Sequence, residues 1–394
     1  MSNGITDFVL PIMAKGLKKL RRSAGIIPLV NRGYEQDFKE KGETVRVNVG
    51  SAKTVSDVTP SMTFPTPADS TLAKIDITLS KWRGTSANIR DDEVQKFDPS
   101  KDFIPGAIDE CISPIIDEIH DHVAAQYTGV YGIVGTAGTT PFASNLDVLV
   151  DAHTVLRDQR APKDARAALI DIPAEGKLLK LTNLQEAQKA GDNRTLREGQ
   201  MGRLLRFDME SADAMPYHTS TALTAGACTV NGAQAAGVGS TDNLLTGTLS
   251  INKLTNAAPV VAGDILEFTV GGVVQQHTVV TGVTLAVGNT SVTVAPALRV
   301  ATAGGETVTL RASHRVNLAF HRDAFALAMV PAKEFTVGGD AASRMIFTQM
   351  VQDPVSGIAI RVQVVRGYHM TAWYFDALWG SKLVRPALAC RIAG

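Results

Sequence analysis

The segment ILEFTVGGVVQQHTVV (Ile265–Val280) joins two runs of strand-forming residues through the pair Gly271-Gly272. Two glycines between such runs are typical of a tight β-hairpin, because the turn positions need a left-handed backbone. The hairpin lies within a long region that is almost free of charge. From Thr219 to Leu310, 92 residues carry six charges (about 7%), whereas the other 302 residues carry 72 (about 24%). This region therefore differs in composition from the chain on either side of it.

Further short strands are expected in the charge-poor region, where helix-forming residues are sparse and Val and Thr are frequent. The expected strands are Gly247–Asn252, Thr290–Val294 and Glu306–Leu310. Because charged sequence resumes on both sides, we interpret the region as a small all-β module, a barrel or a sandwich, inserted into another domain. Two explanations fit its low charge: a compact barrel with a Thr, Asn and Gln surface, or a module that contacts neighbouring subunits or a decoration protein.

A second, longer hairpin is predicted nearer the amino terminus. Apolar and polar residues alternate in Thr44–Val49 and again in Ala73–Ser80, which is the period of a half-buried strand. The connection Gly50–Thr71 contains three prolines and is too long for a tight turn. Because an isolated two-stranded ribbon is marginally stable in water, this one must lie on its own domain or on a neighbouring subunit.

An amphipathic helix is predicted after this hairpin. Its apolar residues recur at steps of three and four and form one stripe, made of Ile108, Ile112, Ile115, Ile116, Ile119, Val123 and Tyr127. Ser113-Pro114 within it predicts either a kink or a new helix start with Ser113 as the N-cap. Further helices are expected at Leu146–Arg157 and Leu178–Ala190.

Strand and helix signals alternate after the charge-poor region. The segments concerned are Val316–Met329, Ile358–Val365 and His369–Leu378. The host of the inserted module is therefore predicted to be an α+β domain.

The composition of the chain is that of a soluble protein of two or three domains. Its 394 residues carry 39 Lys+Arg and 39 Asp+Glu, and this neutral balance argues against a protein that coats nucleic acid. No apolar run reaches the length of a membrane span, and the first residues lack the pattern of a signal peptide. Cys111, Cys228 and Cys390 have neither CxxC nor zinc-type spacing, so we expect no disulfide and no structural metal, as in a reducing compartment.

A basic group stands out in the first 40 residues, which have the pattern of an extended arm. Its members are Lys15, Lys18, Lys19, Arg21 and Arg22. The group is a candidate contact for nucleic acid or for an acidic partner; the alternative is the solvated face of a helix.

No catalytic, cofactor-binding or metal-binding residue is predicted. Gly132, Gly135 and Gly138 match neither a dinucleotide turn nor a phosphate loop, because no Lys-Ser/Thr pair follows them. His321-Arg322-Asp323 resembles a kinase catalytic loop, but Ala328 stands where that loop needs an asparagine, so a charged turn or helix start is expected.

The remaining polar clusters also have structural explanations. On a helix His120 and His122 point about 200° apart and cannot share an ion, and Glu118 with His122 would supply only two ligands. The run Asp91–Glu93 is expected at a helix amino terminus, where the helix dipole favours acids. There is no GxSxG motif and no cysteine in a nucleophile context, so an enzyme would need an unrecognised site.

Three stretches carry a resemblance to a known family. They are RTLREGQMGRLLRFDMESADAMPYHT (Arg194–Thr219) with the following TALTAGACTVNGAQ (Thr221–Gln234), VNLAFHRDAFALAMVPA (Val316–Ala332), and GYHMTAWYFDALWGSKLVRPALACRIAG (Gly367–Gly394) with its DALxGxxxxRP pattern. Together with the order of elements, they resemble the major capsid (coat) proteins of tailed bacteriophages, which have the Hong Kong-type fold. The resemblance is strongest to the coat proteins of short-tailed, scaffold-dependent phages that carry an inserted β-barrel domain.

The resemblance implies an α+β fold in five parts. These are an N-terminal arm (1–38), an extended loop (39–85), a peripheral domain with a spine helix (86–140), an axial domain with returning peripheral strands (141–218 and 315–394), and an inserted β-domain (219–314). None of these parts would be an enzyme or hold a cofactor.

The resemblance also implies a function. The chain would assemble with itself into hexamers and pentamers of an icosahedral shell in the host bacterial cytoplasm, on a scaffolding protein, and the procapsid would expand when double-stranded DNA is packaged. Further implied partners are a portal protein and, in some relatives, a decoration protein, with no membrane involved. The basic arm group would contact scaffold or DNA. The alternative is another multimeric phage structural part, such as a tail-tube or decoration protein.

Overall fold

The structure, a computed structural model, describes most of the chain. The described residues are 25–34, 41–50, 57–58, 60, 62, 72–90, 106–186, 199, 201–221, 228–236, 246–330, 345–352 and 358–394. The basic group of the predicted arm, Lys15 to Arg22, and the acidic run Asp91–Glu93 lie outside these residues.

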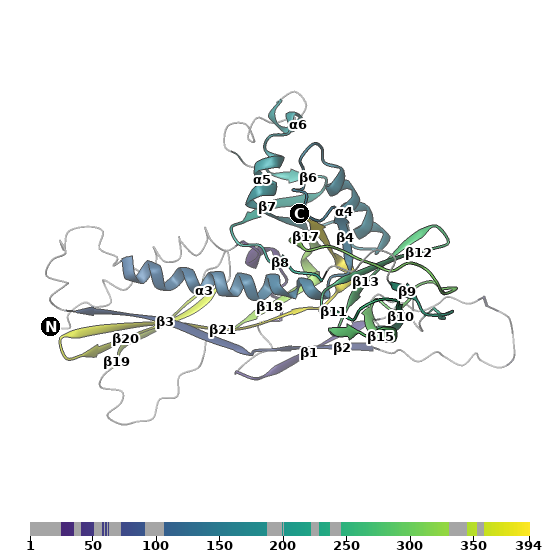
Figure 1. Cartoon of the computed structure of the whole chain (residues 1–394). Helices are drawn as coiled ribbons and strands as arrows, with labels where there is room; N and C mark the ends of the chain where they lie inside the picture. The colour runs from purple at the N-terminus through teal and green to yellow at the C-terminus, as the bar shows by residue number, and fades with distance from the viewer. Residues whose placement is uncertain are drawn as a thin grey trace.

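One long strand, β21 (Met370–Leu383), organises a five-stranded antiparallel sheet. It pairs directly with β3 (Lys81–Arg90), β18 (Phe325–Met329) and β20 (Ala359–Gly367). The fifth strand, β19 (Met345–Gln352), pairs with β20. Because β3 runs beside β21 from Met370 to Trp379, segments almost 300 positions apart in sequence form one extended ribbon (Figure 1).

The predicted amphipathic helix is present as α3 (Gly106–Ala124) and lies along β3 and β21 (Figure 1). Its apolar stripe is buried in one hydrophobic cluster with the inward residues of β21: Ile112, Ile115, Ile116, Ile119 and Val123 with Trp373, Phe375, Ala377 and Trp379. The helix runs through Pro114 as one element, so the alternative of a new helix start at Ser113-Pro114 is wrong.

The predicted amino-terminal hairpin is also present and packs on the opposite face of β21. Strands β1 (Thr44–Gly50) and β2 (Leu72–Thr78) pair in antiparallel register, with Val47 opposite Ile75. At its base, a cluster distinct from that of α3 contains Ile77 and Leu79 together with Leu378 of β21. The hairpin can approach β21 so closely because Gly380 has no side chain: a Cβ there would lie 2.1 Å from the carbonyl oxygen of Thr78.

A seven-stranded mixed sheet forms a second layered unit. Six strands follow the order β4 (Gly132–Gly135), β22 (Ala389–Ala393), β17 (His314–His321), β5 (Arg166–Asp171), β7 (Phe207–Ala212) and β6 (Arg203–Leu204), and β8 (Tyr217–His218) pairs with β17. Helix α4 (Asp147–Asp158) packs on β4 and β22 through Leu149, Ala152 and Leu156, whose three- and four-residue spacing makes one buried face.

The helices after β5 differ from the sequence prediction. Asp171 accepts a hydrogen bond from the backbone N–H of Ala174, which caps α5 (Ile172–Leu178) with Pro173 in its first turn. A short helix, α6 (Thr182–Gln185), follows after a break. The single helix predicted over Leu178–Ala190 is therefore wrong in its described part, because the capping signal at Asp171 starts the helix earlier.

The segments with alternating strand and helix signals form strands with one short 3-10 turn. His369–Leu378 falls almost wholly within β21, and Ile358–Val365 within β20. In β21 the alternation of buried and exposed residues breaks down from Ala377 to Gly380, where α3 covers one face and the hairpin covers the other, so the period of two is hidden there.

The charge-poor region folds into strands as predicted, except that the strand expected over Glu306–Leu310 is reduced to Thr309–Leu310. Six of them form a sheet in the order β16 (Thr309–Leu310), β12 (Ile265–Val270), β13 (Val273–Val279), β15 (Gly288–Ala295), β10 (Gly247–Lys253) and β9 (Cys228–Val230). Gly271 and Gly272 both have positive φ and form the predicted turn between β12 and β13. A two-stranded sheet, β11 (Ala258–Val260) with β14 (Val283–Leu285), packs nearby (Figure 1).

Backbone hydrogen bonds close this six-stranded sheet on itself. The amide of Val230 in β9 donates to Glu306, and the amide of Val308 donates to Cys228, just before β16 begins. Closure brings Gly304 (φ +94°) against Gly232, where a Cβ would lie 2.6 Å from the carbonyl carbon. The ring encloses a core of its own, made of Cys228, Val230, Leu249, Ile251, Val260, Leu266, Phe268, Val279, Leu285, Val292, Val294, Leu298 and Val308.

Short 3-10 helices connect the larger elements. They are η1 (Ile27–Leu29), η3 (Ala125–Gly129), η4 (Arg322–Ala324) and η6 (Pro386–Leu388). The kinase-like triplet at His321 is the start of η4, as expected for a charged turn, with the His321 ring accepting from the amide of Asp323. The glycine-spaced segment Gly132–Gly135 is strand β4, which pairs in parallel with β22.

Replacing Gly380 by Ala is expected to destabilise the protein by about 1–3 kcal/mol, because the new methyl group forces β2 away from β21. The matched control is Gly176→Ala, where no atom lies within 4 Å of the new Cβ in helix α5. Urea unfolding of the full-length chain measures both variants. Equal midpoints for Gly380→Ala and Gly176→Ala would show that the close approach is not required.

Candidate functional site

A buried polar network joins the charge-poor β-ring to the rest of the chain. The His218 Nε2 lies 2.8 Å from Asp264 Oδ1, and the Tyr127 hydroxyl lies 3.0 Å from His218 Nδ1. The Asp264 carboxylate is fully buried and also accepts from the amide of Val261 at 2.8 Å. Three separate elements, η3, β8 and the turn before β12, thus share one chain of hydrogen bonds.

Arg391 of β22 completes this junction. Its guanidinium donates to the carbonyl of Gly263 at 2.7 Å and to that of Thr128 at 3.0 Å, and it lies 5.1 Å from the centre of the Tyr127 ring. Full burial lowers the pKa of Arg391 to about 9, so the group remains charged at neutral pH. Gly263 has φ +93° and lies against Thr128, where a side chain would meet it at 3.1 Å.

A second set of contacts fixes the same face of the ring. The Gln276 side chain of β13 exchanges hydrogen bonds with the backbone of Ile133 in β4, at 3.2 and 3.3 Å. The hydroxyl of Thr278 donates to the carbonyl of Val130 at 3.2 Å. These side-chain hydrogen bonds connect β13 of the ring with β4 and with Val130, which precedes β4. The ring is therefore held to the seven-stranded sheet both here and at the junction of Asp264 and Arg391.

Buried neutral histidines are a further property of this part of the chain. Burial lowers the pKa of His314, beside His218, to about 4, and that of His277 in β13 to about 4. His277 stacks on Phe268 and its Nδ1 lies 2.9 Å from the carbonyl of Pro296. Protonating either ring would place a charge where its Nε2 has no partner among the described residues.

The outer face of the five-stranded sheet and the turn between β20 and β21 expose large apolar side chains. The exposed fractions are 48% for Trp82, 49% for Met350, 90% for Tyr368 and 45% for Tyr374. Asp376 accepts from the Trp82 indole and pairs with Arg361, and Lys41 lies 5.2 Å from the centre of the Trp82 ring. We call Trp82, Met350, Tyr368 and Tyr374 the ribbon patch. Such a grouping of aromatic and methionine side chains is typical of a protein interface.

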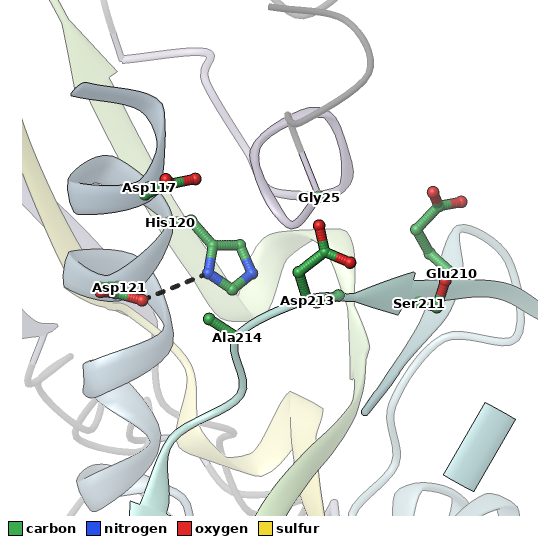
Figure 2. A pocket seen from close by; sticks show the side chains of 9 residues that line it. Gly25, Asp117, His120, Asp121, Glu210, Ser211, Asp213 and Ala214 are labelled. Atoms are coloured by element: carbon green, nitrogen blue, oxygen red, sulfur yellow. Dashed lines mark ion pairs between the residues drawn. The ribbon is translucent and has the colours of Figure 1, made fainter. Parts of the chain in front are cut away.

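An acidic pocket of about 200 Å³ lies between α3 and the end of β7 (Figure 2). Its ionisable lining residues are Asp117, His120 and Asp121 of α3 with Glu210 and Asp213. Gly25, the first residue that the structure describes, also lines it. Burial and the nearby Asp121 and Asp213 raise the pKa of Asp117, and burial with Glu175 raises that of Glu210. Negative charge is therefore concentrated here.

The two helix histidines point to different surroundings, as their spacing predicts. His120 lies in the acidic pocket, whereas His122 Nδ1 lies 2.8 Å from the hydroxyl of Ser381. Glu118 pairs with Arg83 of β3 at 3.2 Å. In the part of the chain that the structure describes, no three His, Cys, Asp or Glu residues are placed to hold a metal ion.

The three cysteines are buried side chains of the protein interior. Cys111, Cys228 and Cys390 are buried and unpaired, and burial raises the pKa of Cys390 to about 12. Within the described ranges, no helix is both long and apolar enough to cross a bilayer.

Sequence reasoning missed the junction and the pocket. Asp264 is one of only six charges in the charge-poor region, and Arg391 is the one charge in the final apolar segment from Pro386 to Gly394. A lone charge in an apolar strand signals a buried, paired group. The pocket gave no comparable signal, because Asp117 and Asp213 are distant in sequence and each is an ordinary surface acid on its own.

Comparison with solved structures reveals a shared fold. A chain of Mycobacterium phage Che8 matches with a TM-score of 0.50 and 12% identity, covering 93% of this chain and 90% of that one. The capsid structure of the cyanophage P-SCSP1u matches with a TM-score of 0.45 and 11% identity, covering 90% of this chain and 84% of that one. The head structure of Helicobacter pylori bacteriophage KHP40 matches with a TM-score of 0.44 and 11% identity, covering 89% of this chain and 85% of that one. No protein-family model and no curated protein matches the chain by sequence. The chain therefore has the fold of the Che8 chain over nearly its full length.

Replacing Arg391 by Gln is expected to destabilise the protein strongly, by about 1–3 kcal/mol for each of the two buried carbonyls that lose their donor. The control is Arg203→Gln, because Arg203 and Asp208 form an exposed pair that contributes little. Thermal unfolding and limited proteolysis at the ring boundaries measure the effect. If Arg391→Gln lowered the melting temperature no more than Arg203→Gln does, the junction would not be needed to stabilise the chain.

The buried histidines predict that stability falls on acidification. A pKa of about 4 in the folded chain, below about 6.5 in the unfolded chain, means that the unfolded state binds more protons between these values. Stability is thus complete above about pH 6.5 and decreases as the pH falls toward 4. Replacing His277 by Gln should flatten the dependence of the melting temperature on pH in this window. Parallel curves for His277→Gln and the wild type would show that His277 does not contribute.

Proposed function

We propose that this protein is the major capsid protein of a tailed bacteriophage and that it assembles with itself into the icosahedral shell around the genome. The observation that carries the proposal is the fold, which matches the phage Che8 chain over almost the entire length of both chains. The quoted resemblances at Arg194–Thr219, Val316–Ala332 and Gly367–Gly394 support it independently, because they come from sequence.

The physical form of the chain supports the same function. The ribbon of β3, β19, β20 and β21 extends well beyond the seven-stranded sheet (Figure 1) and has apolar side chains on its outer face. A single chain gains little from this exposed surface, whereas neighbouring copies would bury it. Interfaces that are individually modest and collectively large suit a shell, since misplaced subunits can still dissociate.

The parts of the chain take the following roles in this proposal. The β1–β2 hairpin is the extended loop, α3 is the spine helix of the peripheral domain with the ribbon, and the seven-stranded sheet with α4 and α5 is the axial domain. The β-ring of residues 228–310 is the core of an inserted domain on the outer surface, and the junction at Arg391 and Asp264 holds it to its host.

The proposed partners follow from the capsid role. The chain would assemble on a scaffolding protein with a portal protein at one vertex, form a procapsid that expands on packaging of double-stranded DNA, and reside in the virion. A decoration protein would bind the outer surface. The basic arm group, made of Lys15, Lys18, Lys19, Arg21 and Arg22, would contact scaffold or DNA by charge.

Sedimentation velocity with negative-stain microscopy tests the proposal, on the chain expressed alone and together with its neighbouring genes. Closed, roughly spherical particles of megadalton mass are expected. Long tubes of stacked rings would instead indicate a tail component. A single species near the 41.8 kDa mass of the chain under both conditions would contradict the proposal.

A paired substitution identifies the assembling surface. Tyr368→Asp with Tyr374→Asp adds two charges to the ribbon patch and should abolish closed particles without unfolding the chain, because both side chains are exposed. The control is Val273→Asp, on the exposed β12–β13 turn of the ring, which should leave the particles intact. Normal particles from the tyrosine variant would rule out the ribbon patch as an interface.

A further inference from the structure

A fully buried arginine at the start of β5 has no counter-ion and one donor without a partner. The Arg166 side chain is 0% exposed, and its Nε donates to the carbonyl of Pro162 at 2.6 Å and its Nη2 to that of Ala161 at 2.9 Å. These two bonds fix the guanidinium, but its Nη1 makes no hydrogen bond to the described residues. Among the same residues, no ion pair joins a carboxylate to Arg166. A buried charge without a counter-ion is costly, so this one indicates a site for an anion.

Two further arginines lie close to Arg166. Arg166 is opposite Phe207 in the parallel register of β5 and β7, so these two side chains share one face of the sheet. The Phe207 ring meets His153 of α4 edge to face, with 6.4 Å between the ring centres, and Arg157 follows His153 by one helical turn. Arg206 immediately precedes Phe207. The three arginines are thus gathered around the Phe207 ring from α4, β5 and the β6–β7 turn, all within the unit of the seven-stranded sheet (Figure 1).

The charges gathered there have one sign. Burial lowers the pKa of Arg166, and the charges of Arg157 and Arg206 lower it further. Burial lowers the pKa of His153 as well, and the same three arginines with Lys163 lower it further. Arg157 and Arg206 are exposed, and neither makes an ion pair within the described part of the chain. Cations without a counter-ion repel one another, so an anion between them would relieve the repulsion and supply an acceptor for the Nη1 of Arg166.

The number of donors selects a phosphate group as this anion. A carboxylate has two oxygens and a single charge, whereas a phosphate monoester has three free oxygens and a charge of about −1.5 to −2 at pH 7. Three guanidiniums, each a planar fork of N–H donors, match the larger number of oxygens and the larger charge. Arg166 is fixed by its two carbonyls, while Arg157 and Arg206 are exposed and can close over a bound group. The neighbouring acids Asp158 and Asp164 are exposed and form no ion pair with the described residues, so they do not take the place of the anion.

We propose that Arg157, Arg166 and Arg206 form a binding site for a phosphate dianion, either free phosphate or the terminal phosphate of a nucleotide. The bound group would join the carboxyl end of α4 to the β6–β7 turn across the start of β5. It would thereby clamp the edge of the seven-stranded sheet that ends in β6. The inference does not rest on the capsid function, because every residue of the site belongs to one chain.

Melting temperatures of the unassembled full-length chain test the proposal, in phosphate-free buffer and with inorganic phosphate at constant ionic strength. Phosphate at about ten times its dissociation constant should raise the melting temperature of the wild type by about 2–4 °C. Arg157→Gln and Arg206→Gln should each lose most of this rise. Without phosphate, both variants should melt at a higher temperature than the wild type, because only repulsion is then removed. Arg166 is left unchanged, since its two buried hydrogen bonds also hold the fold.

The matched control is Arg203→Gln in the same hairpin, because Arg203 has a counter-ion, the exposed Asp208. This variant should keep the full rise with phosphate and should not melt above the wild type without it. An equal rise in the wild type and in all three variants would reveal a general effect of the salt and overturn the proposal. No rise in the wild type would overturn it as well.

Adenosine monophosphate distinguishes the two sources of the phosphate group. A rise with inorganic phosphate alone would assign the site to free phosphate, and a rise with both compounds would assign it to the terminal phosphate of a nucleotide. A DNA duplex without terminal phosphates provides the contrary case. If this duplex stabilised the wild type and inorganic phosphate did not, the arginines would contact the nucleic-acid backbone instead, and the proposal would be wrong.

Discussion

The structure depends on burying both faces of one strand. β21 is 14 residues long, pairs with β3 along most of its length and is covered by α3 on one face and by the base of the β1–β2 hairpin on the other. Trp373, Phe375 and Trp379 point to α3, while Leu378 points to the hairpin, so the period of two divides one strand between two hydrophobic clusters. Beyond the reach of these covers, toward Tyr368, the ribbon has no further layer among the described residues, and it is there that large side chains are exposed. The same strand therefore provides the core of the chain and the surface that we propose other copies cover.

A second constraint holds the β-ring to the central sheet. The ring closes around its own apolar core and could be positioned by loops alone, yet its docking face contains a fully buried Asp264 and a contact with a fully buried Arg391. Buried ions are costly unless every partner is in place, so such a network favours one orientation over others even where it adds little net stability. In the shell and the maturation that we propose, a ring fixed in one orientation would move with its host as a rigid body.

Local signals in the sequence were sufficient for much of this architecture. The Gly271-Gly272 hairpin, the alternation in β1 and β2, and the apolar stripe of α3 each depend on neighbours in sequence, and each is found as predicted. Predictions failed for two different reasons. In β21 the residues from Ala377 to Gly380 are buried without alternation, because α3 and the hairpin cover the two faces there, and this tertiary contact is not visible in the sequence. Helix α5 begins earlier than predicted because Asp171 caps it, which is a local signal that the prediction did not use. The junction of Tyr127, His218, Asp264 and Arg391 unites residues from four distant segments, so the sequence marks Asp264 and Arg391 as lone charges but does not show which residues they meet. The basic arm group lies outside the described residues, and its role stays a prediction.

Hydroxyl-radical footprinting before and after assembly shows whether other copies of the chain cover the ribbon patch. The reactive side chains Trp82, Met350, Tyr368 and Tyr374 are all exposed in the single chain and are readily oxidised residue types. Strong protection of these four residues is expected on assembly, with the buried Trp379 unreactive in both states as an internal reference. Equal oxidation of the four residues in free chain and in assembled particles would contradict this expectation, because the surface left open by β21 would then have no partner.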